Sequence, residues 1–260
     1  MHFLRTRWVS LLTATALLLS GATLTSHAAD SVSDLLKQGD AFEKKLDAVH
    51  ALPFYQSAEQ LQPENAEVQI RISQAFRYLL ADATSKTEKI RLGHIALAHA
   101  EKAAALAPND PEAQLAVGIT YGKMLPYLPT KEQVDATPRI KASVDRTLAL
   151  NPRSDTAWHI LGRWNRVLAD VNSVKRALAG MVYGKLPKGS NEDAARCLEK
   201  AVSINPGRLM HYIELGRVYA QMGRKDDARR CINKGLAMPD AEKDDPEAKE
   251  RGREALNAIR

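Results

Sequence analysis

Four prolines recur along the chain, and each one closes a segment rich in alanine or leucine: Pro63, Pro108, Pro152 and Pro206. Proline cannot continue a helix, because it lacks the amide donor and its ring clashes with the preceding turn. Each proline therefore predicts the end of a helix, and the similar run of residues before each end predicts an array of repeats. Arrays of this kind present surfaces and seldom carry out chemistry.

The last unit shows the pattern of one repeat most plainly. Tyr212, Leu215 and Tyr219 follow one another at steps of three and four residues, which places them on one face of a helix. Gly216 and Ala228 are small, so a second helix can approach the first closely. The pattern is similar to a tetratricopeptide repeat, and it predicts an all-α solenoid of helical hairpins.

The same pattern, aligned on each proline, divides the chain into five repeats and a cap. The repeats cover residues 32–65, 66–110, 111–154, 155–208 and 209–242, and a capping helix over 245–259 follows. The three middle repeats are longer than the roughly 34 residues of a tetratricopeptide repeat. Their extra residues lie between the two helices, so we expect longer helices or inserted loops there.

The first 28 residues have the composition of a secretory signal peptide. Arg5 and Arg7 precede an apolar stretch over 9–19, and Ser26 and Ala28 are small residues at the positions that a signal peptidase reads. We expect cleavage after Ala28, a folded domain over 29–260, and a periplasmic or secreted location. Retention of the segment as a membrane anchor is the alternative.

The centre of the chain is basic. Residues 137–188 contain ten Lys and Arg against three Asp, whereas the flanking parts are acidic or nearly balanced. Solvated helix faces explain this excess most simply. A basic patch that faces an acidic partner or an anionic lipid is the other interpretation.

Two cysteines, Cys197 and Cys231, stand one repeat length apart and thus at equivalent positions of successive repeats. Neighbouring helices pack about 8–10 Å apart, whereas a disulfide needs Cα atoms closer than about 7 Å. We expect two separate thiols that pack as small apolar residues.

The fourth repeat carries the longest insertion. A short helix over 173–184 is predicted there, with Leu178 and Met181 on one apolar side. This side either packs onto the array or lines a groove and contacts a lipid.

Three segments resemble one known family. They are Leu161-Gly162-Arg163-Trp164 with the insertion after it, the stretch Ala-Val-Ser-Ile-Asn-Pro-Gly at 201–207, and the ending 237–245. These segments are similar to the regulator of microtubule dynamics protein family, with the resemblance strongest over residues 140–245. The resemblance implies an all-helical, tetratricopeptide-like array whose roles concern binding rather than catalysis. An exported member would not meet tubulin, so microtubule association is not expected of it.

Motifs of catalysis are missing from the sequence. It has no phosphate-binding glycine loop, no paired-histidine zinc helix and no nucleophile elbow. His94 and His99 are five residues apart, so they do not share a helix face. We expect no catalytic residue, no metal, no cofactor and no nucleic-acid partner.

The inner wall of the array is the surface that remains for function. Residues of the first helix of each repeat that point away from the second helix are expected to line it: Arg71, Gln74, Arg77, Tyr78, His159, Arg163, Arg166 and Arg217. Guanidinium groups bind carboxylates through paired donors. The simpler interpretation is that several arginines pair with Glu67, Asp170 or Glu214 and only shape the wall.

These patterns favour a non-enzymatic, exported scaffold that binds an acidic segment of another protein in its groove. The alternative is a carrier of a lipid or another small ligand that uses the insertion helix with Leu178 and Met181.

Overall fold

The computed structural model describes residues 31–172, 176–177, 180 and 186–260. Within these residues the chain is helical and forms no strand. The helices follow one another as hairpins: α1 (Val32–Glu43) with α2 (Ala48–Leu61), α3 (Ala66–Asp82) with α4 (Lys86–Leu106), α5 (Pro111–Met124) and the short η1 (Leu125–Tyr127) with α6 (Thr130–Leu150), α7 (Asp155–Ala169) with α9 (Asn191–Ile204), α10 (Leu209–Gln221) with α11 (Lys225–Ala237), and then α12 (Asp245–Ala258). The all-α, tetratricopeptide-like fold with five hairpins and a final helix is confirmed.

The four prolines occupy the same place in each link between hairpins. Each proline is the second residue after the last helical residue, and the next helix starts three residues later. Asn65, Asp110 and Ser154 end three of these links, and their side-chain oxygens accept backbone N–H groups of the helix that follows. Such caps satisfy donors that the first helical turn leaves free. The four links therefore have one length, and three of them start the next helix with a side-chain cap, whereas Arg208 at the fourth forms no such hydrogen bond.

Glycines set the close approach of the two helices in a hairpin. A Cβ atom at Gly216 would lie 2.5 Å from Ile232 Cγ1, and one at Gly162 would lie 2.6 Å from Leu198 Cγ. Ile232 and Leu198 are fully buried, and burial of such a side chain stabilises the fold by about 1.5–3 kcal/mol. At Gly223, which joins α10 to α11, φ is +76°, a backbone conformation that suits glycine.

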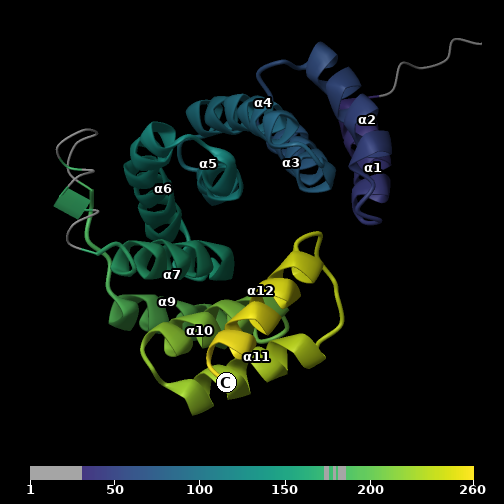
Figure 1. The fold of residues 1–260 in the computed structure, drawn as a ribbon. Coiled ribbons are helices and arrows are strands. Elements are labelled where there is room, and N and C mark those ends of the chain that lie inside the picture. The colour runs from purple at the N-terminus through teal and green to yellow at the C-terminus, as the bar shows by residue number, and fades with distance from the viewer. Residues whose placement is uncertain (1–30, 173–175, 178–179, 181–185) are drawn as a thin grey trace, which may run out of the picture.

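The hairpins stack side by side into a superhelix, and its last part returns toward the first (Figure 1). The first helices of successive hairpins contact one another, as α3 contacts α5 and α5 contacts α7. Helix α12 packs on α10 and α11, so it covers the last hairpin as a cap does. The loop before α12 reaches further, because Lys243 forms an ion pair with Asp82 of α3, with 2.7 Å between Nζ and Oδ1.

Several sequence-based expectations concern residues outside this description. The signal peptide over 1–28 and the residues Leu178 and Met181 of the expected insertion helix are among them. Cys197 and Cys231 are free thiols, and burial raises the pKa of the Cys197 thiol to about 11. No described helix has the length and the apolar character that a membrane crossing needs.

Candidate binding site on the concave surface

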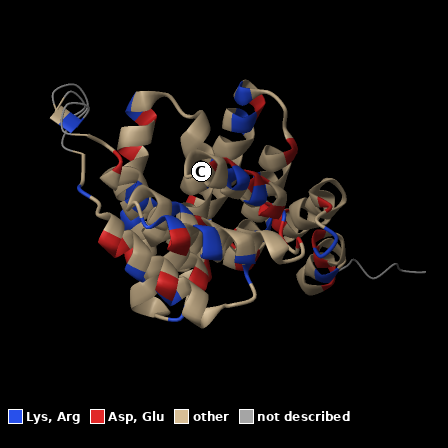
Figure 2. Ribbon diagram, turned by 60° about the horizontal axis from the view of Figure 1, so that its bottom comes forward, with Lys and Arg blue, Asp and Glu red and all other residues tan. Residues whose placement is uncertain are grey.

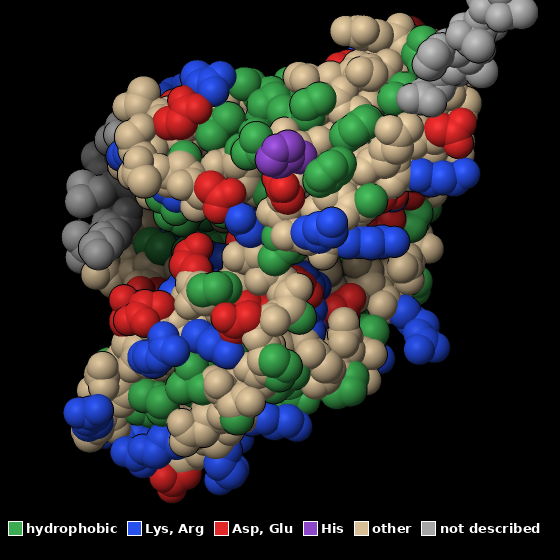
Figure 3. All heavy atoms as spheres, turned by 90° about the vertical axis from the view of Figure 1, so that its right-hand side faces the viewer, with side chains coloured by type: hydrophobic (Ala, Val, Ile, Leu, Met, Phe, Trp, Pro, Cys, Tyr) green, Lys and Arg blue, Asp and Glu red, His purple; other side chains and the backbone are tan. Residues whose placement is uncertain are grey.

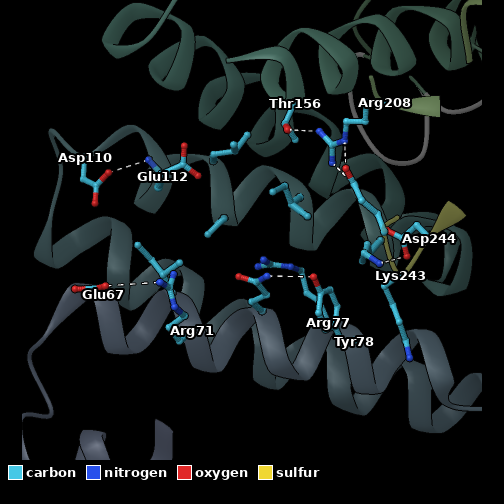
Figure 4. Close-up of a pocket in the computed structure, with 17 residues that line it drawn as sticks. Glu67, Arg71, Arg77, Tyr78, Asp110, Glu112, Thr156, Arg208, Lys243 and Asp244 are labelled. Carbon is cyan, nitrogen blue, oxygen red and sulfur yellow. Dashed lines mark hydrogen bonds and ion pairs between the residues drawn. The ribbon is translucent and has the colours of Figure 1, made fainter. Parts of the chain in front are cut away.

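A cavity of about 480 Å³ lies on the concave side of the superhelix, between α3, α5 and the loop that leads into α12. Five acidic and five basic side chains line it (Figure 4): Glu67, Asp110, Glu112, Glu242 and Asp244, and Arg71, Arg77, Lys123, Arg208 and Lys243. Of the residues predicted to line the groove, it contains Arg71, Gln74, Arg77 and Tyr78. The loop before α12, which supplies three of the lining residues, is absent from the sequence-based prediction.

Arg77 is a buried cation held by neutral groups. Its side chain is 6% exposed, and its Nη1 donates to Ser73 Oγ at 2.9 Å and to Thr120 Oγ1 at 3.3 Å. Burial disfavours the charged form and lowers the pKa of Arg77 to about 10. Among the described residues no carboxylate forms an ion pair with this guanidinium. Arg77 thus stays charged at neutral pH and presents a positive charge to the cavity.

Lys123 lies in the same cavity and is matched by a single carboxylate. Its Nζ donates to Asp244 Oδ1, and its side chain is 16% exposed. Burial lowers the pKa of Lys123, while the charge of Asp244 opposes that shift. Asp244 also attracts the charge of Arg77. Glu43 also attracts the charge of Arg77, and Glu247 that of Lys123, but Asp244 is the carboxylate that acts on both cations. We call Arg77, Lys123 and Asp244 the α3–α5 site.

At the end of the cavity nearest the first hairpin, carboxylates of the chain itself neutralise the lining arginine. Arg71 Nε donates to Asp40 Oδ1 at 2.8 Å, and its Nη2 lies 3.7 Å from Glu67 Oε1. Gln74 donates to Glu43, whose pKa is raised mainly by burial. The expected pairing of Arg71 with Glu67 is present, but the shorter ion pair is the one with Asp40. Arg71 therefore shapes the wall.

A second group of cations surrounds Glu214 of α10. Glu214 is 2% exposed, and its two oxygens accept from Arg166 Nε at 2.6 Å and from Arg217 Nη1 at 2.8 Å. Burial alone would raise the pKa of Glu214, but the charges of Arg166, Arg217 and Arg163 outweigh it and hold the pKa well below its usual range. Arg166 and Arg217, predicted as groove residues, are thus parts of a buried ion-pair cluster.

Arg163 is the third cation of this group, and it keeps no carboxylate of its own. In the described part of the chain, nothing forms an ion pair or a hydrogen bond with its guanidinium, although Glu214 attracts its charge. It lines two further cavities of about 280 and 150 Å³. The larger one has apolar walls that include Ile140, Ile160 and Trp164. We call Arg163, Arg166, Arg217 and Glu214 the α7–α10 site.

His159, also predicted to line the groove, is joined to a buried histidine. His159 Nδ1 lies 3.0 Å from His211 Nδ1, and His211 Nε2 lies 2.9 Å from Asp155 Oδ2. The Asp155 carboxylate can only accept, so His211 Nε2 donates to it, and one of the two facing Nδ1 atoms donates to the other. Burial first, and the charge of His211 second, hold the pKa of His159 well below its usual value of 6.5. Glu214 opposes this shift, whereas Arg208 and Arg163 add to it.

The chemistry that these side chains offer is recognition of anions. Charges of both signs are interspersed along the helices (Figure 2), and Figure 3 shows a hollow across one face with acidic and basic side chains around it. No group of three or more His, Cys, Asp or Glu among the described residues could hold a metal ion. Among the arginines that line a cavity in the described part of the chain, Arg77 and Arg163 form no ion pair, so they are the groups best placed to meet a ligand carboxylate.

The sequence did not reveal several residues that form the ion pairs and hydrogen bonds of these sites. Asp40, Asp244 and Lys123 are absent from its predictions, and so is the link between His211 and His159. Lys123 lies seven residues, about two helical turns, after Ala116, so both side chains are on the same face of α5. Helical periodicity could therefore have placed Lys123 on the inner face. Asp40 and Asp244 gave no such signal. The carrier alternative depends on Leu178 and Met181, which lie outside the described residues, and it stays a prediction.

Known proteins resemble the chain along most of its length. The family model "Regulator of microtubule dynamics protein 1-3" matches residues 32–260. Regulator of microtubule dynamics protein 1 of Caenorhabditis elegans is 28% identical over 139 residues, which are 52% of this chain and 62% of that protein. Protein 2 of Macaca fascicularis is 20% identical over 198 residues, 76% of this chain and 48% of that protein. The chain thus spans less than two-thirds of the length of these two relatives.

A longer match is found in the mouse. Regulator of microtubule dynamics protein 1 of Mus musculus is 23% identical over 236 residues, which are 90% of this chain and 76% of that protein.

Solved structures share the fold at low sequence identity. A thermophilic tetratricopeptide-repeat protein of Thermus thermophilus is similar with a TM-score of 0.61 and 16% identity, covering 87% of this chain and 100% of that chain. The pilF structure of Pseudomonas aeruginosa has a TM-score of 0.53 and 12% identity, with 88% of each chain covered. At this level of identity the similarity shows the fold alone.

Proposed function

The chain belongs to the regulator of microtubule dynamics protein family, and we propose that it is a non-enzymatic scaffold that binds an acidic segment of another protein on its concave surface. The observation that carries the proposal is the pair of cavity-lining guanidinium groups, Arg77 and Arg163, with which no carboxylate among the described residues forms an ion pair. The other lining arginines already hold carboxylates of the chain itself, as Arg71 and Arg208 do.

The chemistry of these two arginines supports a carboxylate as the ligand group. Each guanidinium is largely buried, and burial lowers the pKa of both residues because it removes water from the charged form. A ligand carboxylate that reaches either guanidinium replaces this lost hydration with charge-assisted hydrogen bonds, which are worth about 1.5–3 kcal/mol each. A solenoid with a hollow inner face accommodates an extended segment more readily than a compact domain.

We further propose that this scaffold acts outside the cytoplasm, because residues 1–28 have the composition of a cleavable signal peptide. The intact mass of the chain recovered from a periplasmic or culture fraction is then expected to correspond to a start at Ala29, and a mass that includes residue 1 would contradict this part of the proposal.

The direct test uses a fluorescein-labelled hexa-aspartate peptide and the chain from residue 29 onward. Arg163→Gln is expected to weaken binding by about tenfold or more, because it removes the donors of one charge-assisted contact. Fluorescence polarisation measures the dissociation constant, and circular dichroism checks that the variant is folded. Arg139→Gln is the matched control, since it removes the same charge from an arginine of α6 whose side chain is 63% exposed.

Two results would contradict the proposal. Equal losses of affinity in Arg163→Gln and Arg139→Gln would show that only the net charge matters. Equal binding of hexa-aspartate and hexaglutamine would show that carboxylates are not recognised.

A further inference from the structure

We propose that Arg77 and Lys123 form a carboxylate-binding site that the chain's own Asp244 occupies, so that an acidic segment of a partner binds there by displacing Asp244. The inference rests on the proposed function, since it concerns the same concave surface. It adds which residues bind a ligand carboxylate in the cavity of about 480 Å³. It also adds what regulates access to these residues.

The position of Asp244 is the first observation. Asp244 belongs to the loop between α11 and α12, 121 residues from Lys123 in the sequence, yet its carboxylate accepts from Lys123 inside the cavity. Its side chain remains 29% exposed, whereas Lys123 is 16% exposed and Arg77 is 6% exposed. The two cations are thus more deeply buried than the carboxylate, which the loop before α12 brings to the cavity (Figure 4).

The charge balance is the second observation. Asp244 is the one carboxylate that forms an ion pair with either cation among the described residues, and Arg77 keeps only the hydroxyl groups of Ser73 and Thr120. A partner carboxylate that takes the place of Asp244 restores the ion pair with Lys123, so the exchange costs little electrostatic energy. A second carboxylate next to it would also meet Arg77.

The loop itself is the third observation, because it has the composition expected of the ligand. Residues 240–245 read Asp-Ala-Glu-Lys-Asp-Asp. The other three acidic residues of this stretch, two in the loop and Asp245 at the start of α12, already have roles within the chain. Asp240 pairs with Lys249, Glu242 pairs with Arg208, and Asp245 accepts the N–H groups of residues 241 and 242. Of the four acidic residues, Asp244 is the one that pairs with a cation of the α3–α5 site.

The test compares two substitutions in this loop, each of which removes one negative charge. Asp244→Asn vacates the site, and Asp240→Asn, whose side chain pairs with Lys249 instead, is the matched control. Affinity for labelled hexa-aspartate is measured by fluorescence polarisation on the chain from residue 29 onward. We expect Asp244→Asn to bind about tenfold more tightly than the unchanged chain and Asp240→Asn to stay within about twofold. Addition of Lys123→Met to Asp244→Asn should remove the gain.

The outcomes separate this inference from the proposed function. Unchanged or weaker binding by Asp244→Asn, with binding that still depends on Arg163, would overturn displacement and leave the proposed function standing. Equal gains in Asp244→Asn and Asp240→Asn would overturn it as well, since only the net charge would then matter. If neither the unchanged chain nor Asp244→Asn binds hexa-aspartate, the proposed function fails together with the inference. Thermal melts of all variants show that each one is folded before affinities are compared.

Discussion

The α3–α5 site and the α7–α10 site each hold more cations than carboxylates, but they differ in where their carboxylate comes from. In the α7–α10 site, Glu214 belongs to a packed helix, is 2% exposed and already accepts from two arginines. In the α3–α5 site, Asp244 belongs to a loop, is 29% exposed and, within the described residues, forms an ion pair only with Lys123. A buried carboxylate on a helix is part of the wall. A partly exposed carboxylate on a loop is a group that a ligand can replace.

The largest expected effect comes from neutralising each carboxylate in turn. Glu214→Gln leaves Arg166 and Arg217, whose side chains are only 13% and 22% exposed, without their shared partner. Loss of one member of a buried ion pair costs about 3–5 kcal/mol. Asp244→Asn is expected to cost about 1 kcal/mol, near the upper limit for partly exposed pairs. Urea unfolding followed by circular dichroism measures both. Similar costs for the two substitutions would remove the distinction between a fixed and a replaceable carboxylate.

A smaller effect distinguishes two arginines of the α7–α10 site. Arg166→Gln breaks the 2.6 Å contact with Glu214 and is expected to lower the free energy of unfolding by about 1.5–3 kcal/mol. Arg163→Gln breaks no ion pair among the described residues, so it should cost less than Arg166→Gln, about 1 kcal/mol or below. The same unfolding experiment decides between them. A large stability loss in Arg163→Gln would make Arg163 structural and weaken its assignment to ligand binding.

The smallest effect is a dependence on pH that comes from His159, next to the α7–α10 site. The folded chain holds the pKa of His159 well below 6.5, so between that lowered pKa and 6.5 the unfolded chain binds more protons. Stability is therefore fully present above about pH 6.5 and falls as the pH drops below it. His159→Gln should flatten this part of the stability curve, measured by urea unfolding between about pH 7.5 and pH 5.

His99 provides the control for this pH dependence. Its pKa is also lowered, mainly by burial, so it contributes a loss in the same direction. His99→Gln should remove only its own share and leave that of His159. A curve for His159→Gln that matches the unchanged chain would contradict the role of the histidine pair.

Helix ends and repeat phase followed from the sequence because they depend on local chemistry. Pro63, Pro108, Pro152 and Pro206 each follow a helix end by the same number of residues. The close contact of Gly216 with the following helix agrees with the expectation that small residues let the helices approach. Four of the predicted groove residues, Arg71, Gln74, Arg77 and Tyr78, line one cavity, because helical periodicity fixes which face of α3 points inward.

The pairing of the predicted arginines did not follow in the same way. The sequence pointed to Glu214 as a partner, and Glu214 holds Arg166 and Arg217, which lie 48 residues before it and three residues after it. It gave no sign of Asp40, which reaches Arg71 from the preceding hairpin. Such contacts depend on how the hairpins stack, and a repeat pattern gives their order but not the position of each side chain.

The sequence by itself determined that this chain is an array of helical hairpins, where each hairpin ends, and which faces turn inward, because proline, glycine and helical periodicity act over a few residues. Only the tertiary structure decided which inward cations stay unpaired. That outcome depends on carboxylates delivered from distant segments, above all Asp244, which the final turn of the superhelix brings to Lys123 across the concave surface. An ion pair forms where the stacking of helices places two charges together, and separation along the chain does not limit it.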